Sequence, residues 1–377
     1  MWNAHNAKGC ETVETWQRAL AASVQTPREL AARLGLEPGP LAAVASKYPM
    51  RISPYYLSLI REVGDPIWRQ AVPDPAELDD VGDSEDPLAE EQQSPLPNLV
   101  HRYPDRALFL VSHQCAMYCR FCTRKRKVGR SFVVTKQDIR AGIDYIGAHP
   151  ELRDILLSGG DPLLLGDAVL EDILALLRRI RHVEIVRIGT RVPCVLPERV
   201  TPKLVAMLKK YHPLYVNTHF NHPAEITPES SAACARLADA GIPMGCQTVL
   251  LRGVNDSPET MLALMRALVR IRVKPYYLYQ ADPAQGTHHF RTRVEDGLEV
   301  MEALRGHTSG LAVPYFVIDA PGGKGKIPML PNYCPRPNRD LIRLRNYRGK
   351  ISYYRQVEQR PQRPCAATSE HEVSCCP

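Results

Sequence analysis

A regular alternation of short β-rich runs and amphipathic helical stretches extends from Arg106 to Asp319. This pattern is typical of a mostly parallel sheet wrapped by helices, so we expect an α/β fold. Parallel strands need right-handed crossovers, which favours an open or closed (β/α) barrel with its active residues just after the strands. The seven expected strands are Ala107–Ser112, Asp154–Ser158, Val183–Gly189, Leu214–His219, Gly245–Leu251, Pro275–Gln280 and Tyr315–Asp319. The six expected helices are Lys136–Ala148, Ala168–Arg179, Pro202–Tyr211, Pro228–Ala240, Pro258–Arg272 and Val294–Leu304.

The segments on either side of this alternation have a different character. Residues 1–95 form an N-terminal helical region that ends in an acidic run, Asp74–Glu91, which we interpret as a linker. Residues 96–335 would form the barrel core, and residues 336–377 a C-terminal extension with a loosely ordered tail. The helical patterns of the first region are Val13–Ala22, Pro27–Leu34, Pro54–Glu62 and Pro66–Gln70.

Composition places the chain among globular proteins. It has 377 residues, 44% of them hydrophobic and 24% charged, which excludes a fibrous or wholly disordered chain. We expect a cytoplasmic protein without a membrane span, because no apolar run is long enough and Glu11 and Glu14 interrupt the first twenty residues. A net charge of +7 is too small over this length to indicate nucleic-acid binding. The eleven cysteines should be thiols, and a close group of them indicates a metal or cluster site.

One such group follows the first expected strand. Cys115, Cys119 and Cys122 have the spacing C-x3-C-x2-C on one short loop. Three thiolates can hold three irons of a four-iron cluster and leave the fourth iron open to a small molecule. The alternatives are a zinc knuckle with a distant fourth ligand, or cysteines that serve as small apolar residues.

Six ordered motifs, together with the cysteines, resemble the lysine 2,3-aminomutase family of radical S-adenosylmethionine (SAM) enzymes over about residues 10 to 355. The resemblance implies a partial (β/α) barrel of the radical SAM type with an N-terminal helical extension and a C-terminal extension. The motifs are His101–Arg106, Cys119–Arg124, Ser158–Pro162, Asn217–Pro223, Gln247–Asp256 and Asp319–Lys326.

The resemblance also implies three cofactors and the residues that hold them. These are a [4Fe-4S] cluster, SAM and pyridoxal 5′-phosphate (PLP). The cluster would be bound by Cys115, Cys119 and Cys122, and SAM contacted by Gly159, Gly160, Asp161, Asn217, His219 and Gln247. Lys326 matches the family lysine that forms a Schiff base with PLP, with Lys324 as its local rival, and Arg102 and Arg106 match residues near the PLP phosphate. Considered alone, these residues could also be a plain strand-to-helix turn, a core histidine and surface arginines.

Three further residues match the family's substrate contacts. Arg124 corresponds to the anchor of the substrate carboxylate, for which a guanidinium fork is better suited than an ammonium. Asp282 and Asp319 correspond to the anchors of the lysine side chain. Two carboxylates suit this role, because together they hold an ammonium well and repel another carboxylate. The run Arg124–Lys127 could instead be a basic surface patch for nucleic acid.

The expected activity is therefore the interconversion of L-lysine and L-β-lysine by amino migration, with an external electron donor such as ferredoxin or flavodoxin. Alternatives are the relative that modifies a lysine of an elongation factor, an aminomutase for another cationic amino acid such as arginine, and a metal-stabilised nucleic-acid-binding module. We expect a small-molecule substrate, no nucleic acid and no membrane, and a homo-oligomer is possible.

Two departures from the family concern zinc and oligomerisation. Ser257 stands where clostridial-type members have a zinc-binding cysteine, and Cys365, Cys375 and Cys376 have a different spacing, so structural zinc and a dimer built around it are doubtful. The remaining cysteines of the barrel repeats are expected to be structural thiols, namely Cys194, Cys234, Cys246 and Cys334.

Overall fold

The computed structural model describes residues 14–79, 81–130, 133–334 and 341–356. The chain divides into two compact units that meet between Leu330 and Pro331. The cysteines of the C-terminal tail, Cys365, Cys375 and Cys376, lie outside the described residues.

A nine-stranded sheet forms the centre of the first unit, and its spatial order follows the chain from β1 to β9. Strands β2 to β8 are parallel, whereas β1 and β9 are antiparallel additions at the two edges. The sheet is therefore an open half-barrel, and all seven expected strands are confirmed as β2 to β8. The strands are β1 Leu99–Tyr103, β2 Arg106–Ser112, β3 Asp154–Gly159, β4 Ile185–Gly189, β5 Leu214–Thr218, β6 Met244–Leu250, β7 Lys274–Gln280, β8 Tyr315–Asp319 and β9 Lys326–Pro328.

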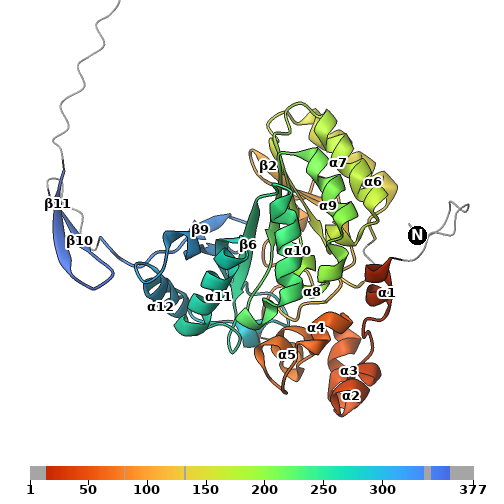
Figure 1. Cartoon of the computed structure of the whole chain (residues 1–377), viewed down its shortest axis with the longest axis horizontal. Coiled ribbons are helices and arrows are strands. Elements are labelled where there is room, and N and C mark those ends of the chain that lie inside the picture. The colour runs from red at the N-terminus through yellow and green to blue at the C-terminus, as the bar shows by residue number, and fades with distance from the viewer. Residues whose placement is uncertain (1–13, 80, 131–132, 335–340, 357–377) are drawn as a thin grey trace, which may run out of the picture. The chain divides into compact units, whose positions relative to one another are not determined.

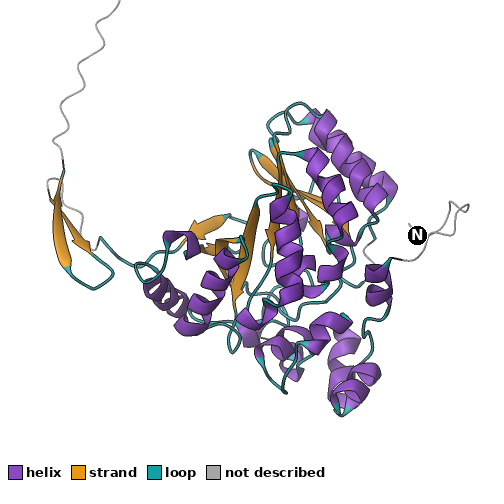
Figure 2. Cartoon of the chain, viewed as in Figure 1, coloured by secondary structure: helices purple, strands orange, loops and turns teal. Residues whose placement is uncertain are grey.

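Helices that connect consecutive strands lie on the outer side of the sheet (Figures 1 and 2). Several begin with a Thr or Ser side chain that accepts a hydrogen bond from the first turn, followed by Pro at the first helical position. Ser257, for example, caps the helix that starts at Pro258. The helices are α6 Lys136–Ala148, α7 Asp167–Arg179, α8 Val192–Val195, α9 Pro202–Leu208, α10 Pro228–Asp239, α11 Pro258–Arg270 and α12 Val294–Leu304.

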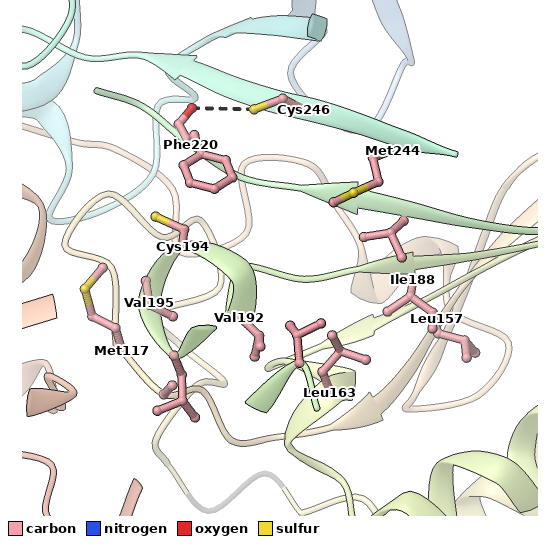
Figure 3. Close-up of a cluster of buried hydrophobic side chains, with 14 of the residues drawn as sticks. Met117, Leu157, Leu163, Ile188, Val192, Cys194, Val195, Phe220, Met244 and Cys246 are labelled. Atoms are coloured by element: carbon pink, nitrogen blue, oxygen red, sulfur yellow. Dashed lines mark hydrogen bonds between the residues drawn. The ribbon is translucent and has the colours of Figure 1, made fainter. Parts of the chain in front are cut away.

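The two faces of the sheet follow from the alternation of side chains along each strand. On the outer face, residues such as Ile155, Val186 and Val216 are fully buried beneath the helices. Figure 3 shows part of this core, in which Cys194 and Cys246 lie among apolar side chains. The cysteines at 194, 234 and 246 are buried free thiols, as expected for structural residues. Side chains of the opposite face line a cavity inside the half-barrel.

Five short helices precede the sheet and pack against it. The third was missed in the sequence because Pro38-Gly-Pro40 resembles a turn, although proline is tolerated in the first helical turn. The acidic run is not a free linker, since Glu77 is buried and paired with Arg120. The helices are α1 Thr15–Ala21, α2 Pro27–Leu34, α3 Pro38–Lys47, α4 Pro54–Ser58 and α5 Pro66–Ala71.

The second unit contains an antiparallel hairpin of β10 Leu341–Arg345 and β11 Ile351–Arg355. Its turn is closed by the side chain of Asn346, which accepts hydrogen bonds from the backbone of Arg348 and Lys350. The sequence predicts a C-terminal extension here with a loosely ordered tail, and residues 357–377 of that tail lie outside the described residues. In the part of the chain that the structure describes, no helix is long and apolar enough to cross a membrane.

Candidate active site

A cavity of about 840 Å³ occupies the inner face of the half-barrel. Most of the residues singled out in the sequence contribute to its wall, although they come from segments more than 200 residues apart. Four residues expected near the cluster and SAM, namely Cys115, Gly159, Gly160 and Asp161, are outside this wall. The expected residues that line the cavity are Arg102, Arg106, Cys119, Cys122, Arg124, Asn217, His219, Gln247, Asp282, Asp319 and Lys326.

The cysteine loop follows β2 and is held by the N-terminal helical region. The backbone N–H of Tyr118 donates to the carbonyl of Arg51, and that of Arg120 donates to the carbonyl of Gln70. Arg120 is fully buried, and its Nε lies 2.8 Å from the carboxylate of Glu77. These contacts fix both the backbone and the side chains of the loop, so the N-terminal region supports the site directly.

The three cysteines are partly buried free thiols. Within the described ranges, no three Cys, His, Asp or Glu side chains converge on one point as ligands of a single metal ion. Each cysteine of a four-iron cluster binds a different iron, so such a cluster does not require this convergence. Cys119 is distinguished by its partner, since the Nη1 of Arg191 lies 2.9 Å from its sulfur.

Gly159 and Gly160 pack against the backbone that leads into the cysteine loop. A Cβ on Gly159 would lie 2.1 Å from the carbonyl oxygen of Ser112, and one on Gly160 would lie 2.3 Å from that of Gln114. Gly159 also has φ +122°, which disfavours other residues. Close packing against the backbone of Ser112 and Gln114 therefore accounts for glycine at both positions, and the contact of these glycines with SAM stays a prediction.

Asp161 is buried just after these glycines. Its carboxylate accepts hydrogen bonds from the hydroxyl of Thr190 and from the backbone N–H groups of Leu163 and Arg191. Burial raises the pKa of Asp161, although these hydrogen bonds oppose the rise. In this structure the side chain connects the turn after β3 to the turn after β4.

Two polar side chains at the end of β5 each have a nitrogen that finds no hydrogen-bond partner among the described residues. The Nδ2 of Asn217 and the Nε2 of His219 are buried in the cavity wall without a hydrogen bond. Burial and, to a smaller extent, the nearby charge of Arg191 lower the pKa of His219 to about 3, so the ring is neutral. Unpartnered buried polar atoms are costly, and here they fit a ligand that supplies the missing bonds. Gln247 donates to the hydroxyl of Tyr279 at 3.2 Å.

Lys326 directs its amine into the cavity, whereas Lys324 is exposed and does not line it. The Nζ of Lys326 lies 2.9 Å from Oδ1 and 3.0 Å from Oδ2 of Asp319. The two residues are also paired in the sheet, Lys326 on β9 and Asp319 on β8. Arg102 donates to Gln93 and to the carbonyl of Leu88, and Arg106 lies over the ring of Tyr103. Two guanidinium groups and one amine thus line the same cavity.

Asp282 lies in the loop after β7 and faces the same cavity as Asp319. Burial and, to a smaller extent, the nearby charge of Asp319 raise the pKa of Asp282 to about 7. The pair expected from the sequence is present, but Lys326 neutralises one of its members in this structure.

Arg124 has a partner that we did not anticipate. Its Nε lies 3.0 Å from both carboxylate oxygens of Glu90, and its Nη2 lies 2.6 Å from Oε1. Burial alone would raise the pKa of Glu90, but the charge and hydrogen bonds of Arg124 hold it at about 2. Glu90 therefore binds one edge of the Arg124 guanidinium, formed by Nε and Nη2, in the cavity wall.

The rest of the basic run is also neutralised by the acidic segment. Lys125 pairs with Glu77, and Arg126 pairs with Asp86 and Glu91. A nucleic-acid patch needs exposed positive charge, which this run does not present. The nucleic-acid alternative is accordingly disfavoured.

Comparison with known proteins agrees with this geometry. The chain matches the radical SAM superfamily over residues 109–265 and the lysine-2,3-aminomutase family over residues 301–374. The L-lysine 2,3-aminomutase of Clostridium subterminale is 53% identical over 346 residues, which cover 90% of this chain and 83% of that protein. The chain belongs to the lysine 2,3-aminomutase family.

Two other proteins have lower sequence identity to this chain. A glutamate 2,3-aminomutase of Clostridioides difficile is 48% identical over 311 residues, covering 82% of this chain and 74% of that protein. Among solved structures, a radical SAM methyltransferase from Sphaerobacter thermophilus covers 60% of this chain and 72% of that chain, with 20% identity and a TM-score of 0.43.

Membership of the lysine 2,3-aminomutase family makes the chain an isomerase and implies a four-iron cluster, SAM and PLP. The described residues fit all three groups: three thiols lie on one loop, polar atoms without a hydrogen bond line the cavity, and a lysine and two arginines line the same cavity. The sequence pointed to these residues mainly through the resemblance to the family, and several of them follow a strand, whereas Arg102 lies in β1 and Arg106 begins β2. It did not point to Glu90 or to Arg191, whose partners are distant in the chain.

Proposed function

We propose that this lysine 2,3-aminomutase family member interconverts L-lysine and L-β-lysine. The observation that carries the proposal is that one cavity is lined by the guanidinium of Arg124 and by the carboxyls of Asp282 and Asp319. A substrate with both a carboxylate and a second ammonium matches charges of both signs in one cavity.

Each of these side chains has a binding or orienting role. Arg124 would hold the substrate carboxylate, and Asp282 with Asp319 would hold the side-chain ammonium. Lys326 would hold PLP, with Arg102 and Arg106 beside its phosphate, and a lysine so engaged leaves Asp319 free to face the substrate. Cys115, Cys119 and Cys122 would hold the cluster, with SAM against Asn217, His219 and Gln247.

When bound, the cluster with SAM supplies the radical that takes a hydrogen from the substrate, and PLP carries the migrating amine. The chain itself positions the substrate and shields it from water. Phe121, which belongs to the cysteine loop, and Phe290 are buried in contact with each other and line the same cavity. Such apolar walls exclude water from reactive species.

Glutamate is the rival that the comparisons bring forward. Bound in the same orientation, its side chain would place a third carboxylate beside Asp282 and Asp319. At an effective dielectric constant of about 20, a like-charge contact at ~4 Å costs about 4 kcal/mol, or roughly three decades in selectivity. Arginine has the same sign as lysine but a longer planar head, so pocket length would discriminate against it less strongly.

The test is an anaerobic measurement of kcat/KM for lysine, arginine and glutamate with the wild type and with Asp282→Asn and Asp319→Asn. We expect lysine to exceed glutamate by roughly three decades and both variants to lose lysine activity. Equal turnover of glutamate and lysine by the wild type would contradict the substrate assignment. Retention of lysine activity by both variants would contradict the two-carboxylate pocket.

We also propose an external low-potential electron donor, such as ferredoxin or flavodoxin, because the cluster must be reduced before SAM is cleaved. A cytoplasmic location and a homo-oligomer remain predictions from the sequence.

A further inference from the structure

Arg191 is buried directly beneath the cysteine loop. It follows β4 and is 8% exposed, and its Nη1 lies 2.9 Å from the sulfur of Cys119. The adjacent Nη2 donates to Oε1 of Gln70 at 2.6 Å and to Oε1 of Glu225 at 2.7 Å. The guanidinium therefore bridges a carboxylate and a cysteine thiol.

The groups around Arg191 hold it in one orientation. Glu225 is fully buried and also accepts hydrogen bonds from the hydroxyl of Tyr56 and the backbone N–H of Asn221, both at 2.6 Å. The backbone N–H of Arg191 donates to Asp161 at 2.8 Å. With its backbone and one end of its guanidinium fixed, Arg191 cannot withdraw from Cys119 without breaking a buried network.

We propose that Arg191 is a positioning residue that orients Cys119 and raises the reduction potential of the four-iron cluster. This inference rests on the proposed assignment of the cluster to Cys115, Cys119 and Cys122. Reduction adds one electron from the external low-potential donor and makes the cluster more negative. A fixed cation that donates an N–H to a ligand sulfur stabilises that added charge.

A second buried arginine provides a matched control. Arg199 is fully buried and pairs with Asp167 at 2.7 Å, and its other hydrogen bonds go to the carbonyls of Leu163 and Leu165. It resembles Arg191 in burial and in having a carboxylate partner, but its polar partners among the described residues do not include a cluster cysteine. Substitution of Arg199 therefore reports the general effect of losing a buried cation.

The experiment is redox potentiometry on the anaerobically reconstituted full chain without substrate, with the reduced cluster followed by electron paramagnetic resonance. In Arg191→Gln, the ratio of reduced to oxidised cluster at a fixed potential should fall about tenfold, which corresponds to a shift of about −59 mV for one electron. Arg199→Gln should keep the wild-type ratio. A wild-type ratio in Arg191→Gln with full iron content, or an equal shift in Arg199→Gln, overturns the proposal.

Because Arg191→Gln leaves Glu225 without its partner, it could fail to hold the cluster. Arg191→Lys is then measured in the same way, since it keeps a positive charge near Glu225 but loses the fork that reaches both groups. Its ratio should also fall, by less than tenfold, and an unchanged ratio overturns the proposal. If the wild type itself binds no iron, the cluster assignment fails instead, and the substrate preference is tested separately by turnover.

Discussion

Two arginine–glutamate pairs in this molecule use the same chemistry for different purposes. Below the cysteine loop, Arg191 and Glu225 are buried, and the guanidinium also reaches Gln70 and the sulfur of Cys119. In the cavity wall, Arg124 meets Glu90 through Nε and Nη2 only, and its side chain is 21% exposed. The first pair is a fixed support, whereas the second leaves part of a cation available.

The difference depends on which edge of the guanidinium is occupied. An arginine has five N–H groups, and Glu90 takes the edge formed by Nε and Nη2. The terminal edge, formed by Nη1 and the second hydrogen of Nη2, can still donate two hydrogen bonds to a carboxylate. Glu90 is therefore compatible with a substrate carboxylate on Arg124, and it would hold the arginine ready for one.

The Lys326–Asp319 ion pair lies in the cavity wall, and removal of its lysine should have the largest effect of the changes proposed here. Lys326→Ala should lower kcat by roughly 10³-fold or more, because the amine that would hold PLP is removed. Lys324→Ala, a matched change on the exposed side of the same loop, should keep activity. Borohydride reduction followed by peptide mapping should place the pyridoxyl group on Lys326. A label on Lys324 would show that our register for this loop is wrong.

The sequence predicted the half-barrel well because its strands are compact apolar runs. It missed β1 and β9, whose short mixed sequences gain their structure only by pairing with the ends of the sheet. Site residues such as His219 and Asp282 were assigned mainly by their match to the family, and their position after a strand agrees with that assignment. Arg191 also follows a strand, but it lies outside the six motifs that carry the resemblance. Glu90 had no such signal, since its acidic neighbours made it resemble solvated linker.

Removal of the carboxylate of Glu90 tests whether the second pair orients a binding group. Glu90→Gln should raise KM for lysine about tenfold and change kcat little, because Arg124 loses a charge-assisted partner on its side edge. Glu91→Gln is the matched control, since Glu91 is the exposed neighbour that pairs with Arg126. A lower KM in Glu90→Gln would instead mean that Glu90 competes with the substrate.

The smallest expected effect concerns Asp282, whose pKa of about 7 makes its charge depend on pH in the working range. An ammonium is bound by the ionised carboxyl, so affinity for lysine should rise with pH. Between about pH 6.5 and 7.5 the ionised fraction rises about threefold, and KM for lysine should fall by about that factor. In Asp282→Asn this pH dependence should disappear, and the remaining KM should be higher.

The raised pKa of Asp282 also predicts how its ionisation changes the free energy of unfolding, which can be measured separately from substrate binding. Burial favours the protonated form of Asp282, so the folded chain binds more protons than the unfolded chain between about pH 4 and 7. Ionisation therefore lowers the free energy of unfolding as pH rises through that window, and Asp282→Asn should remove this loss. The variant should be at least as stable as the wild type at about pH 7.5, as measured by thermal unfolding. A variant that is less stable there and keeps the pH dependence of KM would mean that Asp282 is a structural carboxyl, not part of the ammonium pocket.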